Sequence, residues 1–252
     1  MPHASFPPPS LWDPEGFVTV GGPLSTERLL EAYRKGIFPW PVDETPGGLI
    51  WWSPNPRAVL LPGNLHVPRR LARTLRQGVF RLSSDEAFAR VMDSCASVGD
   101  RKEGTWITPA IRDAYLELHH RGIAHSFEAW QGDRLVGGLY GICLGSMFAG
   151  ESMFSLVRDA SKVVLVSLFK RLVASGCTLF DVQMATDHLM QFGVVEVDRD
   201  AYRLMLAEAV RHPACWPRKE VTPEDAGAAS SLERGQAQGE PSEQVEGGLR
   251  RS

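Results

Sequence analysis

The chain has 252 residues, of which 43% are hydrophobic, and its formal net charge at pH 7 is −3. This length and hydrophobic content predict one large or two small globular domains with a real core. A net charge this small does not indicate any class of partner, so a surface that binds nucleic acid would have to be a local patch. No apolar run is long enough to cross a bilayer, and the N-terminus lacks the basic-then-apolar pattern of a signal peptide.

Cysteine and histidine spacing does not indicate a metal. The four cysteines are far apart and form no CxxC pair, and each falls in or near an apolar stretch, which favours buried, reduced thiols in a cytosolic protein. His119, His120 and His125 have no HExxH or Cys/His spacing around them. We therefore predict neither a metal nor a cofactor.

The first helix is predicted from its boundary signals. Residues 1–22 are rich in proline and glycine and indicate an extended arm. Ser25 is then placed as an N-cap, with Glu27 in the first turn, and Gly36 ends the helix.

A proline-dense segment follows, over residues 37–56. Its prolines exclude a central strand or helix over most of its length and suit a rigid surface that holds Trp40, Trp51 and Trp52 in place. We predict that residues 1–56 form a small N-terminal domain packed on the rest of the chain.

A basic helix is predicted next, with Pro68 in its first turn. Its arginines fall at helical spacing on one side: Arg69, Arg70, Arg73 and Arg76. A solvated basic face is the ordinary interpretation of such a run. However, no acid lies between Leu65 and Gly78 to pair with these side chains.

Two further helices are indicated by capping motifs. Ser83 followed by Glu86 has the spacing of a capping box and predicts a helix start there. Thr108 and Pro109 open the next helix, and Gly122 closes it.

The centre of the chain predicts a sheet with one buried helix. Antiparallel strands are expected over residues 124–130, 135–145 and Met147–Phe154, followed by a helix over Asp159–Ala174 that is apolar on most sides and a strand over 178–184. A short helix, an extended segment and a last helix to about His212 complete the globular part. Residues 218–252 contain no aromatic residue and predict a disordered tail.

Three polar residues stand out in this central region. Asp181 and Gln183 are two apart on an otherwise apolar strand and so share one face. A buried carboxylate is costly unless it is paired or serves a site, so Asp181 is either part of a site or held by backbone donors. Glu151 is the one acid in a segment of small polar residues.

Seven motifs in order now carry a resemblance: GIFPWP, WWSPNPR, TWIT, GGLYG, GESMFS, ASK and FDVQ. Over about Phe6 to Trp216 the chain closely resembles the leucyl/phenylalanyl-tRNA–protein transferases of bacteria. The resemblance implies an α+β protein in which the N-terminal domain packs on an acetyltransferase-like (GNAT) domain, here residues 57–217. It also implies a cytoplasmic enzyme that moves Leu, Phe or sometimes Met from tRNA to proteins that begin with Arg or Lys, which creates a degradation signal.

The resemblance also assigns roles residue by residue. Trp40 and Trp106 match the aromatic pair that holds the 3′-terminal adenosine, and Asp181 and Gln183 match the proposed catalytic pair. The apolar pocket for the aminoacyl side chain is matched by Leu139, Met153, Leu168, Leu172 and Phe180. Some relatives have Phe where this chain has Leu168 and Leu172, and many have Asn where it has Thr186. Phe180 and Asp181 have opposite strand parity, so pocket and catalytic pair meet only if the strand twists or bulges.

The mechanism expected from these residues is direct attack by the acceptor amine on an activated ester. Gln183 is too weakly basic to take a proton and would accept a hydrogen bond from the amine, while Asp181 orients Gln183 and attracts the cationic N-terminus. A relay through the terminal ribose hydroxyl is the rival account. Glu151 is expected to face the acceptor Arg or Lys, or else to stabilise its own loop. The arginine helix is expected to contact tRNA backbone phosphates.

The sequence leaves two alternatives to an aminoacyl-tRNA-dependent transferase. An acyl-CoA-dependent N-acetyltransferase would carry a glycine-containing pyrophosphate loop between a strand and the next helix, and residues 151–162 contain no glycine. A non-catalytic RNA-binding module would use the arginines and tryptophans, but it leaves Asp181 and Gln183 without a purpose.

Overall fold

The computed structural model describes residues 5–41, 48–98 and 105–217. The expected tail, residues 218–252, lies outside the described residues.

The N-terminal region forms a three-stranded antiparallel sheet in the order β1-β3-β2. Its strands are β1 (Phe17–Val20), β2 (Phe38–Pro41) and β3 (Leu49–Trp52), and the helix α1 (Thr26–Arg34) packs with them. Two prolines of this region, Pro39 and Pro41, lie in the edge strand β2, where missing backbone donors cost little, and the central strand β3 has none. Ser25 caps α1 as predicted, because its hydroxyl accepts from the Arg28 backbone N–H.

The extended arm predicted over residues 1–22 is wrong in part. A short 3₁₀ turn covers Pro9–Leu11, and residues 17–20 form β1. The prolines that suggested an arm end before Phe17, so this stretch keeps every backbone donor and can pair with β3, while Val18 is buried.

The larger sheet has seven strands in the order β10-β4-β9-β8-β7-β6-β5. They are β4 (Arg57–Leu60), β5 (Arg81–Ser84), β6 (Ala124–Gln131), β7 (Arg134–Leu144), β8 (Met147–Ser155), β9 (Leu179–Gln183) and β10 (Val195–Val197). All neighbours are antiparallel except β8 and β9, which are parallel and are joined by α5 (Ala160–Ala174). The predicted strand–helix–strand unit is therefore confirmed.

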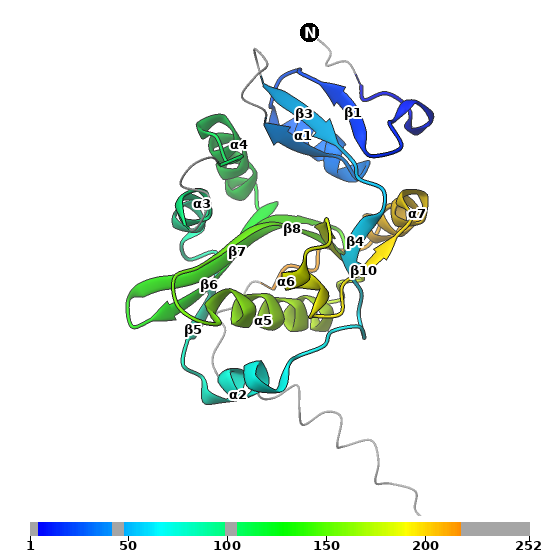
Figure 1. Cartoon of the computed structure of the whole chain (residues 1–252). Coiled ribbons are helices and arrows are strands. Elements are labelled where there is room, and N and C mark those ends of the chain that lie inside the picture. Colours follow the sequence, from blue (N-terminus) through cyan, green and yellow to red (C-terminus); the bar gives the residue numbers. More distant parts are fainter. Residues whose placement is uncertain (1–4, 42–47, 99–104, 218–252) are drawn as a thin grey trace, which may run out of the picture.

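Helices cover both faces of this sheet (Figure 1). One face carries α5 and α2 (Arg69–Gln77); the other carries α3 (Phe88–Ser97) and α4 (Pro109–His120), against which α1 packs. The short helix α6 (Asp187–Met190) and α7 (Arg199–Ala209) follow β9 and β10. As expected from its apolar sequence, α5 is buried over most of its length.

The capping box predicted at Ser83 is wrong. Ser83 belongs to β5, and its hydroxyl donates to the buried carboxylate of Glu128 at 2.6 Å; Glu86 pairs with Arg81 instead. The next helix, α3, begins only at Phe88. A long-range bond thus uses the oxygen that the local motif assigned to a cap.

All four cysteines are buried free thiols. Every helix within the described ranges is short of the length and apolarity that a bilayer span requires.

Two glycines in the left-handed region test how tightly the β7–β8 turn is packed. Gly145 has φ +60°, and a Cβ there would lie 2.4 Å from the Ala209 carbonyl oxygen at the end of α7. Gly132, in the β6–β7 turn, has φ +55° with nothing within 4 Å of a Cβ. We predict that Gly132→Ala costs about 1 kcal/mol of unfolding free energy, from backbone strain alone. Gly145→Ala should cost roughly 2 kcal/mol more through overlap with α7. Urea unfolding of both variants gives the two values, and equal losses would contradict this packing.

Candidate active site

The site opens where two parallel strands separate. β8 pairs with β9 only over Met147–Ala149, although β8 continues to Ser155. Beyond Ala149 a cavity of about 310 Å³ lies between residues 150–153 of one strand and residues 182–184 of the other. Because this cavity sits in a gap of the sheet, side chains from both faces reach it. This separation resolves the strand-parity conflict between Phe180 and its neighbours.

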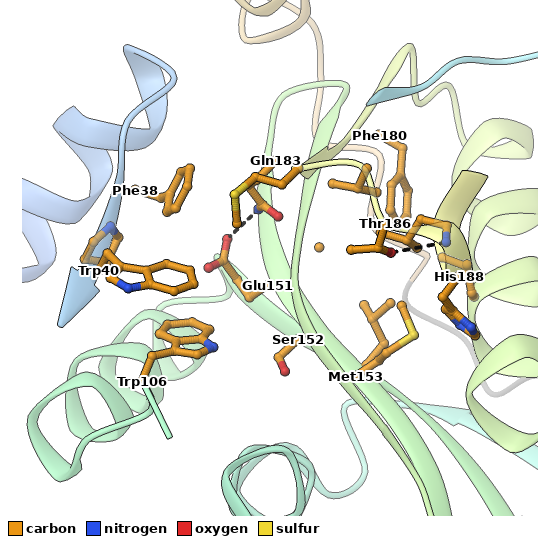
Figure 2. A pocket seen from close by; sticks show the side chains of 17 residues that line it. Phe38, Trp40, Trp106, Glu151, Ser152, Met153, Phe180, Gln183, Thr186 and His188 are labelled. Carbon is orange, nitrogen blue, oxygen red and sulfur yellow. Dashed lines mark hydrogen bonds between the residues drawn. The ribbon is translucent and has the colours of Figure 1, made fainter. Parts of the chain in front are cut away.

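Figure 2 shows three zones along the cavity, in order: an aromatic mouth, a polar centre and an apolar end. Trp40 and Trp106 form the mouth. Glu151 and Gln183 form the centre, and Phe180, Met153 and Thr186 lie beyond them.

The mouth is a pair of parallel indole rings. The ring centroids of Trp40 and Trp106 are 6.2 Å apart and their planes differ by 10°. Trp40 comes from the proline-stiffened edge strand β2 and is 40% exposed, so an aromatic face is open to a ligand. Trp106 stands just before Thr108, whose side chain caps α4. Two rigid elements therefore fix a platform on which a flat ring can stack.

The polar centre is a carboxylate held by three polar neighbours. Gln183 Nε2 donates to Glu151 Oε1 at 3.2 Å, and the Tyr115 hydroxyl donates to Oε2 at 3.1 Å. Tyr33 from α1 hydrogen-bonds to the Tyr115 hydroxyl. Burial raises the pKa of Glu151 to about 7, against hydrogen bonds from Tyr33 and Tyr115 that lower it. This carboxyl group thus titrates near neutral pH.

Asp181 lies behind the cavity wall, not in it. Its side chain is 1% exposed and forms a two-point ion pair with Arg57, with Nε–Oδ1 2.8 Å and Nη2–Oδ2 2.6 Å. Tyr202 donates to the same carboxylate at 2.8 Å. Burial acts to lower the pKa of Arg57, but the Asp181 charge outweighs it and the pKa is raised. The positive charge of Arg57 therefore neutralises the negative charge of Asp181.

Gln183 has an unusual backbone conformation that directs its side chain away from that of Asp181. Gln183 has φ +60°, and its backbone N–H donates to Asp181 Oδ1 at 2.9 Å. The pairing of β4 with β9 also shifts register between Ala58 and Val59. These features turn the Gln183 side-chain amide toward Glu151. Asp181 and Gln183 were expected to place their side chains side by side, but they are linked instead by the bond from the Gln183 backbone N–H to the Asp181 carboxylate.

The apolar end contains three of the five predicted pocket residues. Leu139, Met153 and Phe180 line the cavity, together with Leu165 and Val182. Leu168 and Leu172 do not reach it; both are fully buried on α5 beneath the sheet. The residue of α5 that lines the cavity is Leu165, because the cavity lies over the first half of that helix.

Two polar residues border this end. The Thr186 side chain also lines the cavity, and its hydroxyl accepts from the Leu189 backbone N–H as the cap of α6. Burial and nearby Lys162 lower the pKa of His188, which favours its neutral imidazole.

The arginine helix lies outside the cavity. α2 packs along α5, and its four predicted arginines are exposed: Arg69, Arg70, Arg73 and Arg76. None of them makes an ion pair with any residue that the structure describes. Their charges are therefore available to an outside partner.

Two of the three histidines named above, His119 and His125, have partners of another kind. His119 stacks on Phe88 with centroids 4.2 Å apart, and His125 contacts Asp85 at 2.9 Å. Within the described residues there is no group of three His, Cys, Asp or Glu side chains placed to hold a metal ion.

The sequence analysis also missed four residues that hold the two carboxylates: Arg57, Tyr33, Tyr115 and Tyr202. Arg57 starts an otherwise apolar strand, and an isolated cation of this kind is itself a signal that a buried anion lies nearby. The tyrosines look like core residues at helical spacing, so only the folded chain reveals that their hydroxyls meet carboxylates.

A cavity with an aromatic platform, a polar centre and an apolar end defines an enzyme-type site for a ligand that carries both a flat ring and an apolar group. Two family models match the chain: leucyl/phenylalanyl-tRNA protein transferase over residues 59–207, and the N-terminal domain of the same family over residues 22–55. The chain belongs to this family of aminoacyltransferases.

Several curated relatives carry the name leucyl/phenylalanyl-tRNA–protein transferase. The one from Anaeromyxobacter sp. (strain K) is 53% identical over 211 residues, which cover 83% of this chain and 89% of the relative. That from Pseudomonas putida (strain W619) is 50% identical over 216 residues, 84% and 95% of the two chains. That from Azotobacter vinelandii is 52% identical over 200 residues, 79% and 88%.

The Arg57–Asp181 pair gives a stability prediction. Arg57→Met leaves a buried carboxylate unpaired and Asp181→Leu leaves a buried guanidinium unpaired, so each should lose about 3–5 kcal/mol of unfolding free energy. The double variant removes both charges of this pair, leaves neither unpaired, and should recover at least about 2 kcal/mol of the summed loss. Denaturant unfolding of the three variants measures this coupling. Strictly additive losses would mean that the two charges do not stabilise each other.

Proposed function

We propose that this enzyme transfers Leu or Phe, and in some cases Met, from aminoacyl-tRNA to the α-amine of proteins that begin with Arg or Lys. The product would carry a degradation signal, and the reaction would take place in the cytoplasm. The name that these relatives share supports the tRNA donor and the protein acceptor. The order of the three zones along one cavity is the observation that carries the proposal.

In this proposal each zone takes one part of aminoacyl-tRNA. The terminal adenine stacks on Trp40 and Trp106, a contact worth ~1–3 kcal/mol per base that is indifferent to the rest of the tRNA. The aminoacyl side chain enters the apolar end, against Leu139, Met153 and Phe180. Leu165 takes the place expected for Leu168 and Leu172, which support the wall from beneath. The ester then lies at the polar centre.

The catalytic pair takes unequal roles. The Gln183 amide donates to Glu151, so its oxygen is left to accept a hydrogen bond from the attacking amine. Asp181 acts as a positioning residue, because its carboxylate accepts the Gln183 backbone N–H while Arg57 neutralises its charge. Attraction of the cationic acceptor therefore falls to Glu151, which meets no ion-pair partner among the described residues.

An acetyltransferase-like assignment of the larger domain is also a proposal. Its support is the mixed seven-stranded sheet, in which the parallel pair β8 and β9 is joined by α5 and separates at the site. An acetyl-CoA donor is disfavoured, because residues 151–162, which lead from β8 into the first turn of α5, contain no glycine that would let the backbone approach a pyrophosphate.

The activity test uses radiolabelled Leu-tRNA, Phe-tRNA and acetyl-CoA as separate donors. Acceptors are one protein in two forms, beginning with Arg or with Ala. We expect label in the Arg form from both tRNAs and none from acetyl-CoA. Labelling from acetyl-CoA, or equal labelling of the two acceptors, would contradict the proposal.

The arginine helix is proposed to bind tRNA backbone phosphates, which carry charge and shape but no sequence. Four such contacts would give a slope of log K against log salt near about −3.6, from ~−0.9 per contact in duplex DNA. Replacing Arg69, Arg70, Arg73 or Arg76 by Gln should each reduce the magnitude of the slope by about 0.9 and weaken Leu- and Phe-tRNA equally.

A matched control for this series is Arg34→Gln, an exposed arginine in the last turn of α1, at the other end of the molecule (Figure 1). Its slope should equal that of the wild type. The measurement is tRNA binding across a salt series. If all four α2 variants keep the wild-type slope, the helix is an ordinary solvated face.

A further inference from the structure

We propose that Glu151 accepts the proton from the acceptor α-ammonium, and that Tyr115 and Tyr33 are positioning residues for this carboxylate. The inference rests on the proposed function and assigns the proton route that the sequence left open. It replaces a role for Glu151 as partner of the acceptor's side chain.

Glu151 lies where a base for the acceptor amine is needed. Glu151 lies at the centre of the cavity, between the tryptophan platform and the apolar end (Figure 2), where the ester of a ligand spanning both would lie. Gln183, at 3.2 Å, lines the same cavity. An amine that donates to the Gln183 oxygen is therefore separated from the Glu151 carboxylate by no more than the Gln183 amide group.

Asp181 and Glu151 differ in whether a cation pairs with their negative charge. The Asp181 carboxylate is already paired at two points with Arg57 and also accepts from Tyr202. Among the described residues Glu151 accepts only from neutral donors, namely an amide and tyrosine hydroxyls. The buried group of Arg57, Asp181 and Glu151 thus carries one net negative charge when all are ionised, and Glu151 presents it to the cavity.

Glu151 is also a stronger base than Gln183. An amide oxygen such as that of Gln183 is too weakly basic to take a proton at neutral pH, whereas burial raises the pKa of Glu151 to about 7. The groups that face it are Tyr33 and Tyr115, which lower this pKa, Asp181, which raises it, and Arg57, which lowers it. The ordinary pKa of an α-ammonium is about 7.7–8.0. Proton transfer between two groups of such similar pKa is close to balanced, as suits a general base.

The hydroxyl chain explains how the carboxylate is held. Tyr33 comes from α1 and Tyr115 from α4, and both are fully buried and remain protonated because burial raises their pKa values. Tyr115 packs edge-on against Tyr140 of β7, with centroids 5.7 Å apart. The N-terminal region and the larger sheet therefore fix Glu151 together.

The reaction balances without a further reagent. A proton passes from the α-ammonium nitrogen to a Glu151 carboxylate oxygen, and the freed lone pair attacks the ester carbonyl carbon. The new C–N bond forms and the C–O bond to the ribose oxygen breaks, while a second proton leaves the nitrogen for that oxygen and gives a hydroxyl. Glu151 then releases its proton to solvent, so one proton is liberated per peptide bond.

The test is single-turnover transfer of labelled Leu from Leu-tRNA to a peptide that begins with Arg, at saturating peptide, from pH 5.5 to 9. At pH 6.5 Glu151→Gln should be slower than wild type by about 100-fold, a usual general-base effect. The deficit should shrink to less than about tenfold at pH 9, where the amine is already neutral. Formate should partly restore Glu151→Ala, because it can take the place of the missing carboxylate.

Glu128→Gln is the matched control. Glu128 is also a buried glutamate, held by the hydroxyls of Ser83 and Ser126, and burial raises its pKa to about 7 as well. It does not line the cavity. Its variant should match the wild-type rate within twofold at every pH, which separates proton transfer in the cavity from a general effect of a buried acid.

Tyr115→Phe tests the positioning role. The lost hydroxyl stabilises the ionised carboxylate, so its removal should raise the pKa of Glu151 and move the acid limb of the rate profile to higher pH, with little change in peptide KM. Tyr33→Phe should shift the acid limb in the same direction, because the Tyr33 hydroxyl also lowers the pKa of Glu151. A rate loss without this shift would make both tyrosines merely structural.

Two outcomes would overturn the inference while leaving the proposed function intact. If Glu151→Gln has the wild-type pH profile, the proton goes elsewhere, such as to the terminal ribose hydroxyl. If Glu151→Gln instead abolishes the preference for an Arg peptide over a citrulline peptide without changing the profile, Glu151 binds the acceptor side chain. No transfer by the wild type to any Arg peptide would overturn both.

Discussion

The buried pair of Arg57 and Asp181 is the interaction on which the rest of the structure depends. Arg57 also donates to the Gly36 carbonyl at 2.9 Å and lies against the rings of Phe38 and Tyr202, at 5.2 and 4.5 Å from their centroids. One guanidinium thus joins the end of α1, the strand that bears Trp40, the helix α7 and the strand β9. Neither charge could stay buried alone, so the four elements are held in one arrangement.

That arrangement decides which groups can do chemistry. Because Arg57 neutralises Asp181, the acid predicted to be catalytic becomes a fixed support for the Gln183 backbone. The separation of β8 and β9 then opens the sheet beside it and exposes Glu151 to the cavity. A cavity in which the Glu151 carboxylate lies beside the Gln183 amide can both position a reactant and take up a proton.

Sequence patterns predicted the local elements well and the long-range contacts poorly. Ser25 and Thr108 cap their helices because an N-cap needs only residues three apart. Ser83 failed as a cap because Glu128, 45 positions away, takes its hydroxyl. Arg57 and Asp181 are 124 positions apart, and no spacing rule links them. The family motifs drew attention to residues that line the cavity, among them Trp106, Glu151 and Gln183, but the different contacts of the two carboxylates follow from tertiary structure alone.

The most direct measurement is carbon-13 NMR of the glutamate side-chain carboxyl groups across a pH series, with Glu151 assigned by the signal lost in Glu151→Gln. The account predicts a pKa of about 7 for Glu151. Binding of a peptide that begins with Arg should lower it, because a nearby ammonium favours the ionised form, while the signal of Glu128 stays unchanged. A Glu151 signal that titrates near the ordinary value of about 4.3, or that ignores the peptide, would contradict the claim that this is the reactive carboxylate.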